Sequence, residues 1–450
     1  MGEPALEEGL GSPLLGASEG GGAADDAAAA APQGAGLRGT CFNICNIYIG
    51  LGLLTMPYAL QKGGWAALAA LVAMVLLFGV SGQLICRAFD LMPPGVPRSY
   101  PELGRTAAGA AGARAVLLFC FMELAGASIV LLMVAWQMLE LLLPSEGVGP
   151  LRPLPLAATL STLALLPLLF IELRQLSRLS MLGAASTALV IAMVLALLGL
   201  DPQRAAMPLQ PPPGRHLISA GIIQAVGIFA LSCSAHTTLP ALRSVMRKPA
   251  QFPAALAVSF SVMLACYASL AAAGYWYWGD SASPLVTTDL AINSYYSARR
   301  MPIDRALAVF VLINCLTKYP GLNLILQDML LSALPAARGA GGVFHPPRPW
   351  VVCSLRVGLY AACAAAALAA YQRLGAVLSL LGGLCSITCS LVLPSAFYAR
   401  LAWHRLGGAA KAGLLCMLCL ALCMALLVTG INACELLPAC HGWMHPSHEG

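Results

Sequence analysis

The chain has 450 residues, of which 59% are hydrophobic and 10% charged, and its mean hydropathy is +0.80. A soluble globular protein carries about 25% charged residues, so the composition excludes that class and predicts a polytopic membrane protein. The net charge of +6 does not indicate a nucleic-acid partner, because the cations stand at the ends of apolar segments, where membrane topology places them.

Residues 1–37 form an acidic segment that is rich in Gly and Ala and contains no Lys or Arg. The segment lacks the basic start and apolar core of a signal peptide, so we expect a disordered tail. Lys and Arg between the apolar runs are more frequent on the side of this tail, which predicts a cytosolic N-terminus.

Apolar runs that can cross a bilayer core, which takes about 20 residues, recur along the rest of the chain. They predict eleven transmembrane helices, near residues 40–60, 65–89, 114–143, 154–171, 179–200, 216–240, 252–278, 303–334, 350–370, 374–400 and 411–434. A Pro-rich segment at 201–214 separates the first five from the other six. We therefore divide the chain into a first repeat at 38–200, a second repeat plus the eleventh helix at 201–434, and a lumenal or exterior tail at 435–450.

The first predicted span contains its own helix breakers. Gly50 and Gly52 weaken a helix and Pro57 lacks a backbone N–H, so we expect the helix to open at the glycines and restart with Pro57 in its first turn. An unsatisfied backbone group in hydrocarbon costs on the order of 2–7 kcal/mol, so opened backbone persists only where it lines a cavity. The break therefore predicts a binding site, and the alternative is a helix that is only kinked here.

The first span of the second half is interrupted at the matching place. It carries Ser232, Ser234 and His236 in its middle and Pro240 shortly after them. Two interrupted helices at corresponding positions of two halves indicate a midplane binding site in a secondary transporter. The alternative is that these hydroxyl groups bond only within their own helix.

Three ionisable residues fall inside predicted spans, where each is a functional candidate. Lys318 lies halfway along the eighth span. Glu123 lies in the third span and either carries a proton or pairs with a cation. His236 follows the second break and could titrate near neutral pH, although a neutral, hydrogen-bonded His is the alternative.

The motifs combine into a recognisable pattern. It comprises Phe42, Asn43, Asn46, Gly50, Gly52 and Pro57 in the first span, Ser99-Tyr100-Pro101-Glu102 after the second, Ser232 to His236 with Pro240 in the sixth, and Thr317-Lys318-Tyr319 in the eighth. This pattern resembles the amino acid/auxin permease family, and within it the vacuolar and vesicular amino acid transporter branch. Cys233 and Ala235 depart from that branch, which usually has Tyr and Gly at these two positions.

The resemblance implies an all-α, leucine-transporter-type fold of eleven helices, with inverted five-plus-five repeats and broken helices 1 and 6. It implies a transporter of neutral amino acids that works by alternating access, and not an enzyme. The expected partners are the substrate, protons and the lipid bilayer of a vacuolar, lysosomal or other endomembrane. We expect a monomer without cofactor, metal ion or nucleic acid.

Two sets of site residues follow from the breaks and from the resemblance. The substrate-binding set is Asn46, Gly50, Leu51, Gly52, Ser232 and Ser234, and the ion-coupling set is Glu123, His236, Thr317 and Lys318. An amino acid is a zwitterion, and interrupted helices offer it free N–H groups for the carboxylate and free carbonyls for the ammonium.

Lys318 bears on the coupling ion. The resemblance implies that sodium-coupled members of the family hold the ion between an Asn of the first helix, matching Asn46, and oxygens of the eighth helix. Lys318 brings a positive charge to this region, and two cations about 4 Å apart repel by roughly 4 kcal/mol at an effective dielectric near 20. We therefore predict sodium-independent, proton-coupled transport, with Glu123 or His236 exchanging the proton. The alternative function is a membrane amino acid sensor that transports little and signals through the acidic tail.

Overall fold

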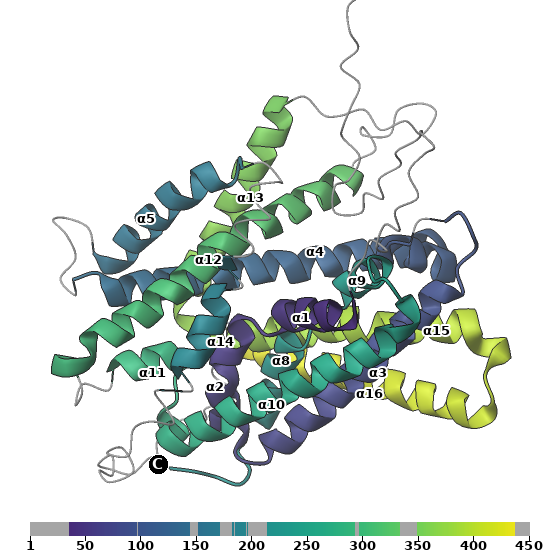
Figure 1. The fold of residues 1–450 in the computed structure, drawn as a ribbon, viewed down its shortest axis with the longest axis horizontal. Coiled ribbons are helices and arrows are strands. Elements are labelled where there is room, and N and C mark those ends of the chain that lie inside the picture. Colours follow the sequence, from purple (N-terminus) through teal and green to yellow (C-terminus); the bar gives the residue numbers. More distant parts are fainter. Residues whose placement is uncertain are drawn as a thin grey trace, which may run out of the picture.

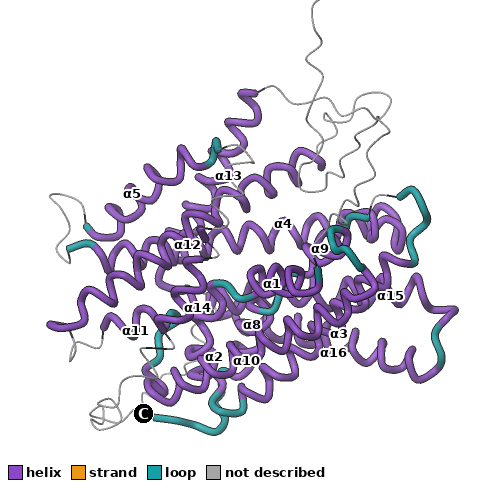
Figure 2. Tube along the Cα trace, in the orientation of Figure 1, coloured by secondary structure: helices purple, strands orange, loops and turns teal. Residues whose placement is uncertain are grey.

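The computed structural model describes residues 36–96, 98–144, 152–171, 182–183, 185–194, 196, 214–292, 297–333 and 349–436. The two predicted tails, apart from residues 36–37 and 435–436, and most of the Pro-rich segment lie outside these ranges. All regular elements of the described part are helices, drawn in purple in Figure 2.

The labelled α-helices run in chain order through the predicted spans and the segments between them. They are α1 (Leu37–Tyr48), α2 (Met56–Gly63), α3 (Ala67–Asp90), α4 (Tyr100–Leu142), α5 (Pro153–Leu168), α8 (Ile222–Ser232), α9 (Leu239–Ser244), α10 (Phe252–Trp278), α11 (Val286–Ile292), α12 (Ser297–Ala333), α13 (Pro349–Ala370), α14 (Leu374–Leu381), α15 (Leu393–Ala402) and α16 (Gly408–Leu436). Figure 1 shows α1 and α8 in the middle of the molecule, between α4 and α12 on one side and α10 and α3 on the other.

Six of the described helical stretches are long and apolar enough to cross a membrane, and the bent pair α1–α2 raises the number to seven. One of them, Pro349–Arg405, has 57 residues and covers two predicted spans, since one crossing takes about 20 residues. Three shorter apolar helices, Pro153–Leu168, Ala185–Val194 and Ile222–Thr238, lie where the remaining spans are predicted. The described helices thus overlap each predicted span.

The predicted break in the first span is confirmed. Helix α1 ends at Tyr48, and Gly50 has the non-helical dihedral angles φ −124° and ψ −144°. A 3-10 turn, η1 (Leu51–Thr55), follows, and α2 restarts with Pro57 in its first turn. The two helical parts are bent by 51°.

The second break is confirmed as well. Helix α8 ends at Ser232, the next three residues are not helical, and the 3-10 turn η2 (His236–Thr238) leads into α9. Pro240 stands in the first turn of α9, where its missing N–H would have no partner within the helix.

Helix α4 begins earlier than the sequence predicts. The predicted span starts near residue 114, whereas α4 starts at Tyr100, where the Ser99 hydroxyl accepts a hydrogen bond from the Glu102 N–H. Gly109 has a φ of 65° and interrupts the helix between its polar first part and its apolar second part. The hydropathy pattern marked only the second part.

Helix α8 packs closely against the tenth predicted span. In this span two π-helical turns, η8 (Gly382–Ser386) and η9 (Thr388–Val392), connect α14 to α15. A Cβ atom at Gly227 would lie 2.5 Å from the Ser379 carbonyl oxygen, and one at Gly382 would overlap the Gly227 carbonyl oxygen. Only glycine allows this approach of the two backbones.

We expect the substitution Gly382→Ala to lower the thermal midpoint of the protein in detergent, because overpacking costs about 1–3 kcal/mol. Gly413→Ala in α16 is the matched control, since a Cβ there meets no atom within 4 Å. Equal midpoints for the two variants would contradict this packing.

Candidate functional site

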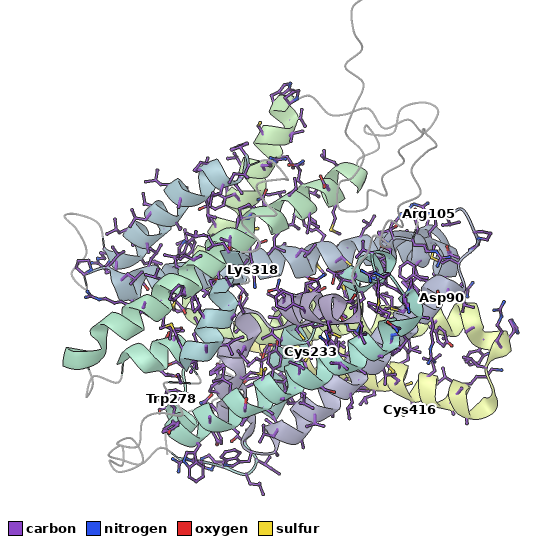
Figure 3. All side chains as sticks on the ribbon, in the orientation of Figure 1. Asp90, Arg105, Cys233, Trp278, Lys318 and Cys416 are labelled. Atoms are coloured by element: carbon purple, nitrogen blue, oxygen red, sulfur yellow. The ribbon has the colours of Figure 1, made fainter. Side chains whose placement is uncertain are left out.

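The two helix breaks lie against each other in the middle of the molecule. A Cβ atom at Gly52 would lie 2.5 Å from Ser232 Oγ, and η1 packs against α8. In Figure 3, Cys233 and Lys318 lie between one end of the molecule, marked by Asp90 and Arg105, and the opposite end, marked by Trp278. This central position is where a midplane site is predicted.

Tyr267 of α10 connects the two breaks. Its hydroxyl lies 2.8 Å from the carbonyl oxygen of Tyr48 and 3.0 Å from that of Ser232, which are the last residues of α1 and α8. Helix ends leave such carbonyls without a partner in the helix, and Tyr267, which is fully buried, supplies the donor to both.

Ser232 and Ser234 differ in their partners. The Ser232 hydroxyl donates to the Ile228 carbonyl 2.9 Å away, within its own helix. The Ser234 hydroxyl donates to Glu123 Oε1 over 2.6 Å. Substrate contact by these two hydroxyls stays a prediction, and in this conformation both are occupied by groups of the protein.

Glu123 lies at the centre of a hydroxyl network. Its Oε1 accepts from Ser234 and from Ser386, the latter at 2.8 Å, and Ser390 Oγ lies 2.7 Å from Ser234 Oγ. The network joins α4 to the break after α8 and to both π-helical turns, and such turns are frequent at functional sites.

The sequence analysis did not single out Ser386 or Ser390. The available signal was their spacing of four residues within an apolar run, which puts both hydroxyls on one side of a helix.

His236 is fully buried and hydrogen-bonded. Its Nε2 lies 2.9 Å from the Phe78 carbonyl oxygen, and the Tyr48 hydroxyl lies 3.5 Å from its Nδ1. The carbonyl can only accept, so Nε2 carries the proton and Nδ1 is the acceptor for Tyr48. A neutral imidazole satisfies both contacts, which favours the neutral alternative for this residue.

Lys318 lies beside the first break. A Cβ atom at Gly50 would lie 3.3 Å from Lys318 Nζ. Among the described residues, no carboxylate forms an ion pair with this ammonium. Thr317 instead donates to the Asn314 carbonyl and faces Gly183, so the structure brings Lys318 but not Thr317 to the break.

Asn46 and Leu51 are the remaining predicted residues, and both lie within a few positions of Gly50. Asn46 is half-buried on α1, four residues before Gly50. Leu51 belongs to η1, and its side chain lies outside the described part of the structure.

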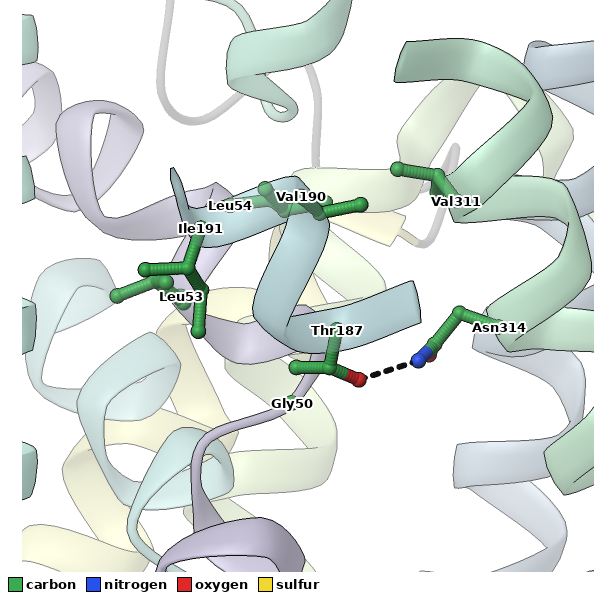
Figure 4. A pocket seen from close by; sticks show the side chains of 8 residues that line it. All are labelled: Gly50, Leu53, Leu54, Thr187, Val190, Ile191, Val311 and Asn314. Atoms are coloured by element: carbon green, nitrogen blue, oxygen red, sulfur yellow. Dashed lines mark hydrogen bonds between the residues drawn. The ribbon is translucent and has the colours of Figure 1, made fainter. Parts of the chain in front are cut away.

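A small pocket opens from Gly50 toward α12 and the helix Ala185–Val194 (Figure 4). Its walls are Leu53, Leu54, Val190, Ile191 and Val311, and its polar residues are Thr187 and Asn314. Its free space holds roughly one water molecule, which is less than an amino acid needs.

Asn314 lines this pocket and is not among the residues predicted from the sequence. Its side-chain nitrogen donates to the Gly183 carbonyl at 2.9 Å and to Thr187, whereas its Oδ1 is buried and has no partner within the described part of the chain. The signal was a lone amide side chain inside an apolar run, one turn before Lys318.

Helix α11 lies outside the predicted spans and packs against η1. Asp289 of α11 accepts the Ser283 N–H with both carboxylate oxygens, at 2.9 and 3.0 Å. Burial raises the pKa of Asp289 to about 6, against a smaller lowering by the Ser283 hydrogen bonds.

Long apolar helices, two interrupted helices in contact and ionisable groups at their breaks define a multi-pass membrane protein with a central polar site. Residues 33–433 match the family described as transmembrane amino acid transporter protein. The chain belongs to this family, whose members are transporters rather than enzymes.

Two relatives illustrate the similarity. The amino acid transporter AVT1B of Arabidopsis thaliana is 28% identical over 363 residues, which cover 79% of this chain and 63% of the relative. AVT1H of the same plant is 25% identical over 384 residues, which cover 83% and 84%. The chain therefore spans just under two thirds of the length of AVT1B.

Among solved structures, the inward-facing conformation of Mhp1 has a TM-score of 0.52 at 14% identity, covering 90% of this chain and 92% of that chain. Mhp1 has the leucine-transporter fold, and the likeness supports that fold for this chain.

We expect Tyr267→Phe to lower the thermal midpoint in detergent, because the buried Ser232 carbonyl loses its donor at a cost of about 1–3 kcal/mol. Tyr275→Phe, on the same helix and also buried, is the matched control, since the Tyr275 hydroxyl accepts from the His216 N–H and lies away from both breaks. A midpoint for Tyr267→Phe as high as that of the control would show that the bridge contributes nothing.

A second prediction concerns Asp289. Its folded-state pKa lies above its ordinary value, so it contributes stability that is complete in acid and is lost as the pH rises through about 6. On going from pH 7 to pH 5, wild type should gain about 1 kcal/mol of unfolding free energy relative to Asp289→Asn. Chemical unfolding in detergent at both pH values measures the difference, and parallel behaviour of the two proteins would refute it.

Proposed function

We propose that the protein is a secondary active transporter of neutral amino acids. The single observation that carries the proposal is the contact between the two interrupted helices, whose last carbonyls converge on Tyr267. Backbone that is opened in the membrane interior persists where it lines a ligand site, so this contact supports a transport site at the two breaks. The family membership supports the same substrate class.

The proposed mechanism is alternating access in a fold of eleven helices with inverted repeats at 38–200 and 201–434. In this conformation the pocket beside Gly50 is smaller than an amino acid, so the proposed cycle includes a state in which it is wider. The cytosolic N-terminus and the vacuolar, lysosomal or other endomembrane location belong to this proposal, and they rest on the distribution of cations and on the resemblance.

Coupling to protons is assigned to Glu123. Its carboxylate contacts hydroxyls on the break after α8 and on the π-helical turns, so its protonation changes contacts between a helix that is expected to move and its neighbours. A neutral His236 already has a partner for each ring nitrogen, which makes it the weaker candidate. Lys318 supplies the positive charge that a sodium ion would otherwise bring to the first break.

The test is uptake of a panel of labelled amino acids into proteoliposomes that hold the purified full chain. We expect uptake of neutral amino acids that an imposed pH gradient drives and that is unchanged when choline replaces sodium. Uptake that requires sodium and ignores the pH gradient would overturn the coupling. Amino acid binding without flux in any condition would favour the sensor.

Glu123→Gln should abolish the stimulation by the pH gradient while amino acid exchange across the membrane at equal pH continues, because exchange requires no net proton movement. Glu140→Gln is the matched control on the same helix, where the carboxylate accepts from Tyr371. Normal pH-driven uptake by Glu123→Gln would remove this residue from the mechanism.

A further inference from the structure

Lys318 presents a charge without a counter-charge. Its Nζ lies against Gly50, at the point where the backbone of the first helix is open, and no acidic side chain among the described residues pairs with it. Lys318 is partly buried, and an anion or several acceptors around a partly buried ammonium compensate for the water that it has lost. The arrangement calls for an anion that comes from outside the protein.

The pocket beside Gly50 indicates which chemical group the ligand carries next to its anionic end. Val311, Asn314 and Lys318 are spaced by three and four residues, so they share one face of α12, and this face points at the break. The pocket walls are aliphatic, and none of the residues that line it is charged. The ligand therefore carries its charge at one end and an apolar group beside it.

Asn314 gives the third element of recognition. Asn314 lines the pocket, and its Oδ1 is buried without a partner in the described part of the chain, whereas its amide nitrogen has three oxygens within hydrogen-bond distance. A buried acceptor without a donor is rare in proteins. It lies about one helical turn from Lys318 and fits an N–H donor of the same ligand.

We propose that the substrate site is this pocket together with Lys318, which lies outside the pocket but beside its lining residue Gly50. Lys318 pairs with the α-carboxylate, Asn314 Oδ1 accepts from the ammonium, and an aliphatic side chain lies between Leu54, Ile191 and Val311. This proposal rests on the proposed function and narrows the substrate to branched aliphatic amino acids such as leucine. The site must widen to admit the ligand, since its free space now holds roughly one water molecule.

Two leucine analogues test the assignment in competition with labelled L-leucine uptake. L-Leucinamide keeps the ammonium and the side chain but has no carboxylate, whereas 4-methylpentanoate keeps the carboxylate and lacks the ammonium. The assay is run at about pH 6, where the α-amino groups of leucine and leucinamide are protonated. Wild type should prefer leucine to each analogue by at least about tenfold.

The variants should separate the two ends of the ligand. Lys318→Met should weaken leucine by at least about tenfold while leucinamide changes little, so that the preference between the two collapses. Asn314→Leu should weaken leucine and leucinamide equally and leave 4-methylpentanoate unchanged. Lys62→Met is the control, because the Lys62 ammonium lies over the Tyr58 ring, 5.2 Å from its centroid, on another helix.

Several outcomes would overturn the proposal. An unchanged leucine-to-leucinamide preference in Lys318→Met is one. A wild type that accepts leucinamide as well as leucine is another, and it needs no variant to fold. Equal uptake with chloride replaced by gluconate is expected, and an absolute chloride requirement would assign the Lys318 ammonium to a halide ion instead.

The same assay separates this proposal from the proposed function. Transport of other amino acids but not of leucine, valine or isoleucine leaves the transporter in place and removes the aliphatic site. A wild type that moves no amino acid under any gradient removes both.

Discussion

The structure depends on how it satisfies backbone groups that two broken helices expose in the membrane interior. Each such group left alone in hydrocarbon costs on the order of 2–7 kcal/mol. The Tyr48 carbonyl receives the Gly50 N–H and the Tyr267 hydroxyl, and the Ser232 carbonyl receives the same hydroxyl. One side chain from a third helix therefore fixes the distance between the two breaks. Any ligand that binds there must share or replace these bonds.

The two ionisable side chains near the breaks, Glu123 and Lys318, differ in the partners that the protein gives them. Glu123 has two serine hydroxyls within hydrogen-bond distance, so its negative charge can be held by the protein alone. Lys318 is partly buried and has no comparable partner among the described residues. An anion that binds beside Lys318 would therefore form an ion pair in a poorly solvated place, where the attraction between charges is stronger than in water.

The positions of both breaks could be predicted from the sequence because Gly50, Gly52, Pro57 and Pro240 act locally, on the hydrogen bonds of their own turn. The partners of the breaks could not. Tyr267 is one of several tyrosines in apolar runs, and its role depends on contacts across 219 residues to Tyr48 and 35 to Ser232. Ser386 and Ser390 reach the site through π-helical turns that their hydropathy does not indicate. Asn314 is uncharged, so a search for ionisable residues inside the spans selects Lys318, four residues later, and not Asn314.

The two helix breaks expose backbone groups in the membrane interior, but different residues surround each break. The first break is lined by glycines, so nothing but backbone separates Lys318 from the opened turn. The second break carries hydroxyls, and Ser234 passes its contact on to Glu123 and Ser390. The first break is therefore suited to a charged ligand, and the second to a titrating group of the protein. Gly52 lies against Ser232, so the two breaks are in direct contact, and under the proposed function this contact connects Glu123, through Ser234, with a ligand beside Gly50.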